Sequence, residues 1–236
     1  MFQTDPFTLI IMLVGLSLLP FVAMVATSYL KIVVVMSLIR NALGIQSIPP
    51  NMVINALAMI LSFYIMAPVM SESWEIAKTE MAAKGRETAS AAVAGNAGTS
   101  ASGGRWLETD AIAKAAEPFR DFLSKHVSDR ERAFFINTAE RLWARNEDEP
   151  ATVDPDGFCI LIPSFCVSEL TKAFQIGFLV YLPFIAIDII VSNILLAMGM
   201  MMVSPVTISL PFKLLLFVMV NGWTLLIQGL VRGYAI

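Results

Sequence analysis

The sequence predicts an all-α, membrane-associated protein with four long apolar helical segments and a small, helical polar insert. Of the 236 residues, 57% are hydrophobic and 15% are charged, and the mean hydropathy is +0.72. Soluble chains average about 25% charged residues. The charges are also unevenly spread, because 27 of the 35 lie in residues 72–156. This composition excludes a soluble enzyme, a disordered chain and a nucleic-acid-binding protein with a basic footprint.

The first apolar stretch covers residues 7–39 and is interrupted only by Lys31. As one helix it would be about 50 Å long, whereas the hydrocarbon core of a bilayer is about 30 Å thick. Pro20 lies inside it and predicts a kink or a break. No Lys or Arg precedes the stretch, which is also too long for a signal peptide, so we expect it to remain in the mature protein.

The second apolar stretch, residues 52–70, contains no charge. Gly44, Pro49 and Pro50 lie before it and turn the chain, which predicts an apolar helical hairpin over residues 1–71. Arg40 and the nearby Lys31 place the connecting loop in the cytoplasm by the positive-inside rule. Two crossings then place residues 72–156 in the periplasm.

The polar insert, residues 72–156, has two parts. Ala, Gly, Ser and Thr make up 18 of the 23 residues in 82–104, which is typical of a flexible linker. Residues 108–145 carry a helical pattern, and Ser128 with Glu131 matches a capping box. The insert is therefore predicted to end in a short helical region.

The last two stretches, residues 174–203 and 206–231, predict a second apolar helical hairpin within residues 157–236. Pro183 predicts a kink or a break in the first of them. That stretch would be about 45 Å long as a helix, and tilting alone does not fit it into a bilayer. Part of the apolar surface is therefore expected to face other protein chains in an oligomeric assembly.

Three charged residues within residues 157–236 need partners. Asp188 and Lys213 lie at bilayer depth, where an ionisable side chain indicates a functional site or an ion pair. We interpret Glu169 and Lys213 as a salt bridge that orients helices. For Asp188, three roles stay open: a proton or ion site, a hydrogen-bonded packing residue, or an acid that lines a water-filled path.

Methionines cluster at the turn between the last two stretches. Met198, Met200, Met201 and Met202 surround Gly199 and precede a Ser–Pro pair, which predicts a helix end or a loop. Methionine is unbranched and adaptable, so it seals against irregular surfaces. Ordinary apolar packing and a seal are both consistent with this pattern.

The sequence contains no catalytic constellation, and we expect no enzyme activity. Cys159 and Cys166 form no CxxC pair and are expected to be buried free thiols. His126 is the only histidine, so the usual zinc or haem ligand sets cannot be assembled. No metal or other cofactor is expected.

Several ordered motifs resemble one family, the core export-apparatus subunit of type III secretion, called FliP in flagella and SctR in injectisomes. They cover about 150 residues at both ends of the chain, and the insert departs from the family pattern. The motifs are Leu19-Pro20-Phe21, Arg40-Asn41-Ala42-Leu43-Gly44, Ile48-Pro49-Pro50-Asn51, Ser168-Glu169-Leu170 through Ile176-Gly177-Phe178, Tyr181-Leu182-Pro183-Phe184 with Asp188, Leu195 through Met202, and Ser209-Leu210-Pro211-Phe212-Lys213-Leu214.

The resemblance implies a subunit of a helical export channel at the bacterial inner membrane, with much of the assembly on the periplasmic side. Family members form a pentamer that joins two smaller membrane subunits, FliQ/SctS-like and FliR/SctT-like, and works with FlhB/SctU-like and FlhA/SctV-like subunits. Unfolded proteins pass through the channel. The missing signal peptide favours the injectisome branch, in which secretion serves virulence.

The resemblance also implies roles for single residues. The methionines Met198, Met200, Met201 and Met202 form a gasket in the pore. Glu169 and Lys213 pair between neighbouring subunits. An acid at the position of Asp188 belongs to the family motif, but its role does not follow from the match.

Two other functions remain open from the sequence. A small-solute or ion transporter could use Asp188 and Lys213 as coupling charges, although such proteins usually contain two related halves, and the halves of this chain differ. A structural membrane anchor for the helical insert is the other alternative.

Overall fold

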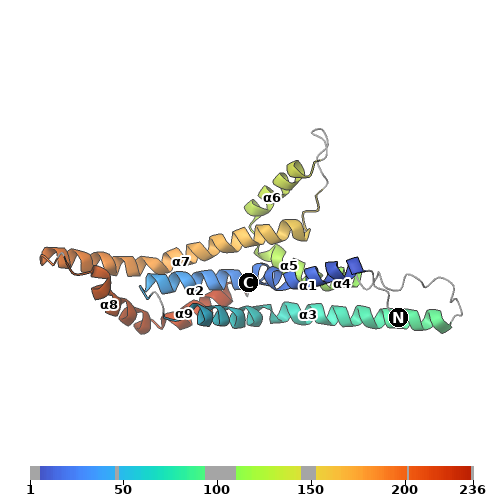
Figure 1. Ribbon diagram of the computed structural model, residues 1–236, viewed down its shortest axis with the longest axis horizontal. Helices are drawn as coiled ribbons and strands as arrows, with labels where there is room; N and C mark the ends of the chain where they lie inside the picture. The colour runs from blue at the N-terminus through green and yellow to red at the C-terminus, as the bar shows by residue number, and fades with distance from the viewer. Residues whose placement is uncertain (1–5, 46–47, 94–109, 145–152, 201, 235–236) are drawn as a thin grey trace. The chain divides into compact units, whose positions relative to one another are not determined.

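The computed structural model describes residues 6–45, 48–93, 110–144, 153–200 and 202–234, and all regular elements within these ranges are helices (Figure 1). The all-α prediction is therefore confirmed. In chain order the helices are α1 (Pro6–Val25), α2 (Tyr29–Ala42), α3 (Asn51–Val93), α4 (Asp110–Ala115), α5 (Glu117–His126), α6 (Asp129–Leu142), α7 (Phe158–Ala197), α8 (Pro205–Met219) and α9 (Gly222–Arg232).

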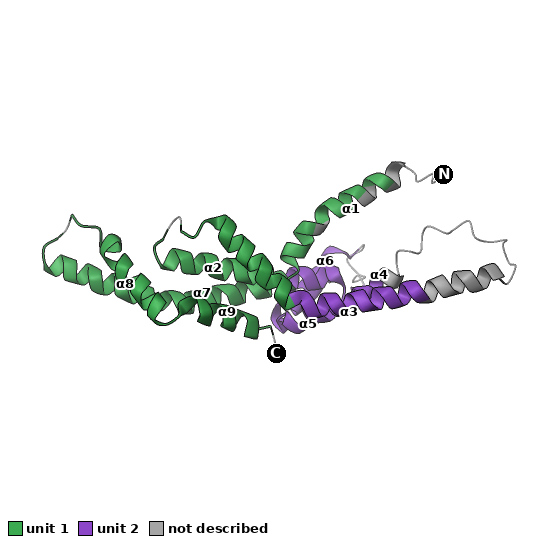
Figure 2. Ribbon diagram, turned by 90° about the horizontal axis from the view of Figure 1, so that it is seen from below, with its two compact units in different colours: residues 1–65, 165–236 green, residues 66–164 purple. Residues whose placement is uncertain are grey.

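The chain divides into two compact units (Figure 2). Unit 1 consists of residues 1–65 and 165–236, and unit 2 consists of residues 66–164. Helices α3 and α7 each contribute residues to both units. The two apolar ends of the chain thus share one unit, while the polar insert, residues 72–156, belongs to the other. The three segments predicted from the sequence, with boundaries at 71/72 and 156/157, stay a prediction.

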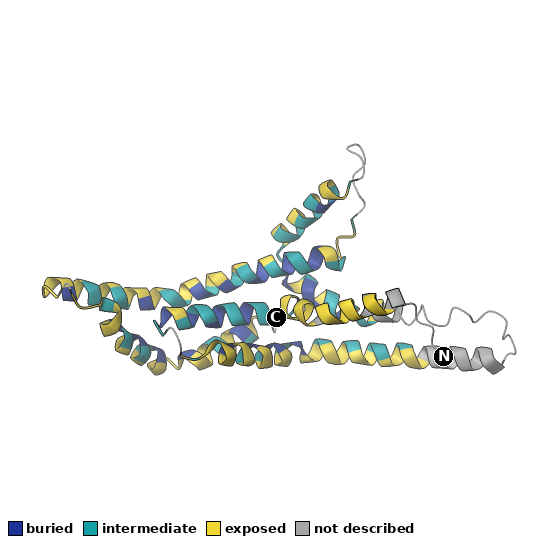
Figure 3. Cartoon of the chain, viewed as in Figure 1, coloured by how far each residue is buried: buried dark blue, intermediate teal, exposed yellow. Residues whose placement is uncertain are grey.

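Helix α2 supplies the centre of the core of unit 1. Its buried residues Ile32, Val35, Met36 and Ile39 recur at i, i+3, i+4 and i+7, which places them on one helical face. Buried residues of other elements belong to the same cluster: Ala58 of α3, Ala173 and Phe184 of α7, Phe217 of α8 and Leu230 of α9. By contrast, the described side chains of α1 are exposed, as Figure 3 shows in yellow.

A small residue lets α7 approach α2 closely. A Cβ atom at Gly177 would lie 2.3 Å from Leu38 Cδ1. A larger residue would therefore displace Leu38, which explains why glycine stands at this helix contact.

The first and fourth apolar stretches are each broken into two helices. The axis bends by 56° between α1 and α2 and by 58° between α8 and α9. At the first break, the hydroxyl of Ser28 donates to Ser62 Oγ at 3.1 Å. At the second, Asn221 adopts the left-handed helical conformation, with φ 51° and ψ 47°.

The structure has no break at Pro20 or Pro183, and a kink, the other outcome that the sequence predicted there, stays a prediction. Helix α1 continues through Pro20 and α7 continues through Pro183. An internal proline removes one backbone hydrogen bond, which a long helix tolerates by bending.

Two helical segments are long and apolar enough to cross a membrane, residues 51–82 and 158–197. Each bent pair would add one more crossing if its two helices act as a single span. The described chain therefore offers two to four membrane crossings.

Unit 2 contains the helices of the polar insert. Leu123 and His126 of α5 and Ala139 of α6 are buried, and α6 begins directly after Ser128, which is extended with φ −78° and ψ 138°. Helix α3 continues to Val93, so residues 82–93 are helical where the sequence predicted a linker. Alanine, lysine, arginine and glutamate in this part favour a helix. Residues 94–104 of the predicted linker lie outside the described residues.

Candidate functional site

Two groups of buried charge lie in unit 1 among apolar side chains. The Glu169 cluster consists of Glu169, Lys31, Lys172 and Tyr234. The Asp188 cluster consists of Asp188, Ser209 and Lys213. A charge inside apolar protein is unfavourable unless it is paired and hydrogen-bonded. These two clusters are therefore where the fold is most dependent on specific polar contacts.

Glu169 is the centre of the first cluster. Glu169 has no exposed surface, and α7 positions its carboxylate between two lysines. Oε1 accepts a hydrogen bond from Lys172 Nζ at 3.2 Å, one turn later on α7. Oε2 lies 3.4 Å from Lys31 Nζ of α2 and accepts a hydrogen bond from the Tyr234 hydroxyl. One carboxylate thus connects α2, α7 and the segment after α9.

Tyr234 contributes two contacts to this cluster. Its hydroxyl donates to Glu169, and its ring lies under Lys31, with 4.2 Å between Nζ and the ring centre. Burial and the adjacent Glu169 carboxylate hold the pKa of the Tyr234 phenol well above its usual range. The phenol therefore stays protonated and remains a hydrogen-bond donor.

The Asp188 cluster joins α7, α8 and the end of α2. Asp188 Oδ2 pairs with Lys213 Nζ at 2.6 Å, and Oδ1 accepts a hydrogen bond from Ser209 Oγ at 2.6 Å. Ser209 and Lys213 are four residues apart on α8, so they lie on the same helical face. Lys213 Nζ also donates to the carbonyl oxygen of Ala42 at 3.3 Å. That carbonyl lies in the last turn of α2, where carbonyl groups lack intrahelical partners.

The arrangement in both clusters is suited to holding helices together. Each carboxylate faces an ammonium group and accepts a hydrogen bond from a hydroxyl group. Among the residues that the structure describes, no group of three His, Cys, Asp or Glu side chains is arranged to hold a metal ion. The free thiols expected to be buried are exposed in the case of Cys159 and partly exposed in the case of Cys166.

The methionine turn, residues 198–202, lies between α7 and α8, as the sequence predicted. Gly199 has φ +74°, and its N–H donates to the Leu196 carbonyl at 3.0 Å. The N–H of Met200 donates to the Leu195 carbonyl, also at 3.0 Å. These two bonds with a left-handed glycine form a Schellman motif, which ends α7 with its last carbonyls satisfied.

The side chains of this turn point away from the core. Met198, Met200 and Met202 are exposed, with Met202 fully so. Met201 lies outside the described residues. Ordinary packing within the chain therefore does not explain the three described methionines, because burial is what packing requires.

The structure brings together two of the residues singled out from the sequence and separates others. Asp188 and Lys213 form a pair within one chain. Glu169 pairs instead with Lys31 and Lys172 of its own chain, so the helix-orienting bridge between Glu169 and Lys213 is not present inside the chain. The pairing of Glu169 and Lys213 between neighbouring subunits stays a prediction.

The sequence analysis did not identify Tyr234 and Ser209 as partners of these charges. Lys31 carried a signal, because it is the only charge in the first apolar stretch and so required a buried partner. Ser209 stands four residues before Lys213, a spacing that indicates a shared face. No local pattern connects Tyr234 with Glu169.

Known proteins match this chain along almost its whole length. The sequence profile of the FliP family matches residues 12–230. The "Yop proteins translocation protein R" of Yersinia pestis is 48% identical over 98% of this chain and 97% of its own length. The "Hypersensitivity response secretion protein HrcR" of Ralstonia nicotianae is 46% identical over 96% of both chains. The "Flagellar biosynthetic protein FliP" of Bacillus subtilis is 37% identical over 96% of this chain and 90% of its own length.

Proposed function

Because the chain belongs to the FliP family, we propose that it is a core subunit of the type III secretion export gate, through which unfolded proteins leave the cell. The observation that carries this proposal is the extent of the match. The profile covers residues 12–230, and secretion proteins align over nearly their full length. The family is a structural component of the export apparatus rather than a known enzyme family.

The chain fits the injectisome branch better than the flagellar branch. Identity is 48% and 46% to the translocation and hypersensitivity-response secretion proteins but 37% to the flagellar protein. We infer a role in virulence-associated secretion from the names of the more similar relatives.

The apolar helices and the family indicate a multi-pass membrane protein. The bacterial inner membrane, with part of the assembly on the periplasmic side, is the location we propose. Helix α7 supports this proposal. Its 40 residues extend about 60 Å, twice the thickness of the hydrocarbon core, so part of its apolar surface requires protein neighbours.

The proposed neighbours are further copies of this chain, in a pentamer, and other components of the apparatus. These components are the two smaller FliQ/SctS-like and FliR/SctT-like subunits and the FlhB/SctU-like and FlhA/SctV-like subunits. Exposed apolar side chains on α7 support extensive contacts, for example Phe174, Phe178 and Ile190. Membership in the export apparatus implies assembly with other components, and the stoichiometry is part of the proposal.

The methionine turn is the proposed seal of the pore. Exposed methionines on a backbone held by a Schellman motif support this role, because the side chains can adapt while their attachment points stay fixed. The gasket consists of Met198, Met200, Met201 and Met202. It would close on itself at rest and deform around a passing polypeptide.

The proposed contact of Glu169 with Lys213 of a neighbouring subunit requires an exchange of partners. Glu169 already accepts from two lysines and Tyr234, and Lys213 is held by Asp188. In this proposal, Asp188 is the partner of Lys213 within its own chain. A small-solute transporter is not supported, because the family profile and the relatives that match nearly the whole chain are secretion proteins.

Deleting the gene in its own host and measuring secreted proteins in the culture medium tests the proposed function. Secretion is expected to stop and to return with the wild-type gene, and the detergent-extracted chain is expected in a large complex with other export components. A monomer or dimer, together with unchanged secretion in the deletion strain, would refute the export-gate proposal.

Replacing Met198, Met200, Met201 and Met202 with alanine tests the seal. The described methionines are exposed in the single chain, so complexes are expected to assemble at the normal yield while small ions leak across the membrane. The same number of alanine replacements at exposed apolar positions of α1, such as Leu13 and Leu16, is the matched control. Loss of complex without any leak would show that the methionines only pack.

A further inference from the structure

The Asp188 cluster joins α7 and α8 close to the methionine turn that connects them. Helix α7 continues for nine residues after Asp188, and α8 has eight residues before Lys213. These lengths correspond to about 12–14 Å along the helix axes. The cluster is therefore only two to three helical turns away from the methionine turn on both helices.

Few buried side chains lie between the cluster and the methionine turn. Among the described residues of 189–200 and 202–208, only Leu195 is buried. The exposed side chains in this part include Ile190 and Ile194 of α7 and Ile208 of α8. Because apolar stabilisation is proportional to the area removed from water, packing within the chain contributes little to the position of the turn.

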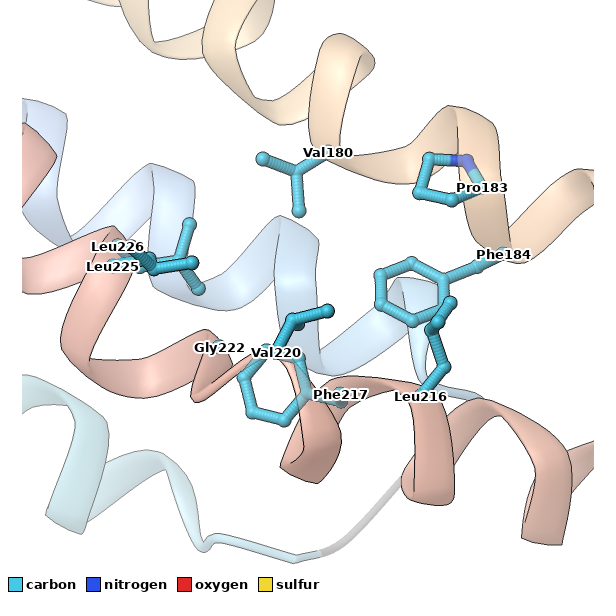
Figure 4. Close-up of a pocket in the computed structure, with 9 residues that line it drawn as sticks. All are labelled: Val180, Pro183, Phe184, Leu216, Phe217, Val220, Gly222, Leu225 and Leu226. Carbon is cyan, nitrogen blue, oxygen red and sulfur yellow. The ribbon is translucent and has the colours of Figure 1, made fainter.

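On the other side of the cluster, apolar contacts between α7 and α8 are incomplete. Phe184 of α7 and Phe217 of α8 lie one helical turn further from the methionine turn, with 6.4 Å between their ring centres. Figure 4 shows both at a pocket of about 320 Å³ between α7, α8 and α9, which is lined only by apolar residues and glycine. An empty volume offers no partner atoms to its lining, so apolar packing holds α8 against α7 only weakly at this point.

Asp188 restricts α8 in two directions at once. Its Oδ1 accepts from Ser209 Oγ and its Oδ2 pairs with Lys213 Nζ, each at 2.6 Å. Because these two donors stand one helical turn apart on α8, neither rotation nor sliding of that helix keeps both bonds. Lys213 also donates to the carbonyl oxygen of Ala42, which connects the same part of α8 to α2 at the centre of the core.

We propose that Asp188 is a positioning residue of the pore seal, because its bonds to α8 fix where the methionine turn lies at rest. The role rests on the proposed seal and deepens it, since it names what holds the seal in place. Of the three roles that stayed open for Asp188, it is that of a hydrogen-bonded packing residue. The bond from Ser209 remains when Lys213 turns to Glu169 of a neighbouring subunit, so the role is compatible with pairing between subunits.

Ion leak per assembled complex tests this role. Complexes are extracted from the host membrane, quantified by gel filtration and reconstituted into liposomes, and potassium efflux is measured. Ser209→Ala removes one bond and leaves the ion pair, so complexes should assemble at the normal yield. The loss of one hydrogen bond shifts an equilibrium about fivefold, and we expect the leak to rise by about that factor. Asp188→Ala removes both bonds and is expected to leak more; where it fails to assemble, Ser209→Ala decides.

Ser28→Ala is the matched control. Ser28 is as fully buried as Ser209, and its hydroxyl donates to Ser62 at 3.1 Å, but it lies at the break between α1 and α2. Its replacement should leave the leak unchanged. Equal leaks from Ser28→Ala and Ser209→Ala would overturn the proposal, because any weakening of unit 1 would then open the seal.

The alanine variant of the four methionines separates a failed seal from a failed positioning role. This variant should leak, and adding Ser209→Ala should not increase its leak, because Ser209 acts through the seal. An additive increase would refute the positioning role. If the methionine variant leaks while Ser209→Ala and Asp188→Ala do not, the seal stands and the positioning role is wrong. If the methionine variant does not leak, the seal is wrong and the positioning role falls with it.

Discussion

The Glu169 and Asp188 clusters use the same chemistry at different depths. Both contain a carboxylate, a lysine and a hydroxyl donor. The Glu169 side chain has 0% exposure, whereas the Asp188 side chain is 34% exposed and only its partner Lys213 is buried. A carboxylate that reaches solvent retains part of its hydration when its partner is removed, and a fully buried one does not. The first cluster is therefore expected to be a fixed part of the fold, and the second a pair that can open.

The largest expected effect is that of Glu169→Ala. The change leaves the buried ammonium of Lys31 without its carboxylate and should destabilise the protein by about 3–5 kcal/mol. Denaturant unfolding in detergent, followed by helical circular dichroism, measures this difference. Lys172→Ala is the matched control, because Lys172 is half-exposed and its loss should cost at most about 1 kcal/mol. Equal effects of the two variants would contradict a structural role for the buried pair.

Two charge exchanges distinguish contacts within one chain from contacts between chains. The double variant Lys31→Glu/Glu169→Lys restores opposite charges inside the chain and should recover most of the stability lost in Glu169→Lys. The double variant Glu169→Lys/Lys213→Glu puts a third lysine beside Lys31 and Lys172, so it should not recover chain stability. Recovery of complex assembly by that second variant, measured by gel filtration, would support pairing between subunits.

Tyr234→Phe should have the next largest effect. It removes the hydroxyl that donates to Glu169 but keeps the ring under Lys31. A hydrogen bond to a charged group contributes about 1.5–3 kcal/mol, and the same unfolding measurement should show a loss in this range. Tyr181→Phe, which changes a tyrosine outside both clusters, serves as the control. A loss of stability no greater than that of the control would show that the Tyr234 hydroxyl does not stabilise the Glu169 cluster.

Asp188→Asn should have the smallest effect of the series. Asparagine retains an oxygen that can accept from Ser209, and Lys213 still donates to the carbonyl of Ala42. The buried ammonium of Lys213 thus keeps oxygen acceptors, unlike that of Lys31 in Glu169→Ala, so we expect a loss of about 1 kcal/mol. A loss as large as that of Glu169→Ala would show that the two clusters do not differ in the way described.

The sequence predicted the helices better than it predicted which side chains pair with the buried charges. Hydropathy and length identified the four apolar stretches, because a long apolar run has few alternatives to a helix. The kink or break expected at Pro20 is not where the chain breaks; the break lies at Ala26–Ser28, where the hydroxyls of Thr27 and Ser28 are hydrogen-bonded with Ser62 of α3. Glu169 and Tyr234 are 65 residues apart, and periodicity within one helix does not indicate which residue of another helix it meets.

The site was predicted only where a local pattern encoded it. The Ser–Pro pair that follows the methionines predicted the turn, because proline interrupts a helix. The pairing of Asp188 with Lys213 depends on how α7 and α8 cross, which no local pattern encodes. Both residues were identified as charges in need of partners, but Lys213 was paired with Glu169 rather than with Asp188.

The Schellman motif at Gly199 affects how fast the methionine side chains can move as well as where they lie. Because hydrogen bonds fix the backbone at Gly199 and Met200, the motion left to the exposed methionine side chains is exchange between rotamers. Such exchange takes picoseconds to nanoseconds, whereas movements of loops and domains take up to milliseconds. A ring of such side chains would follow each passing residue almost instantaneously and would close again without any refolding of the turn.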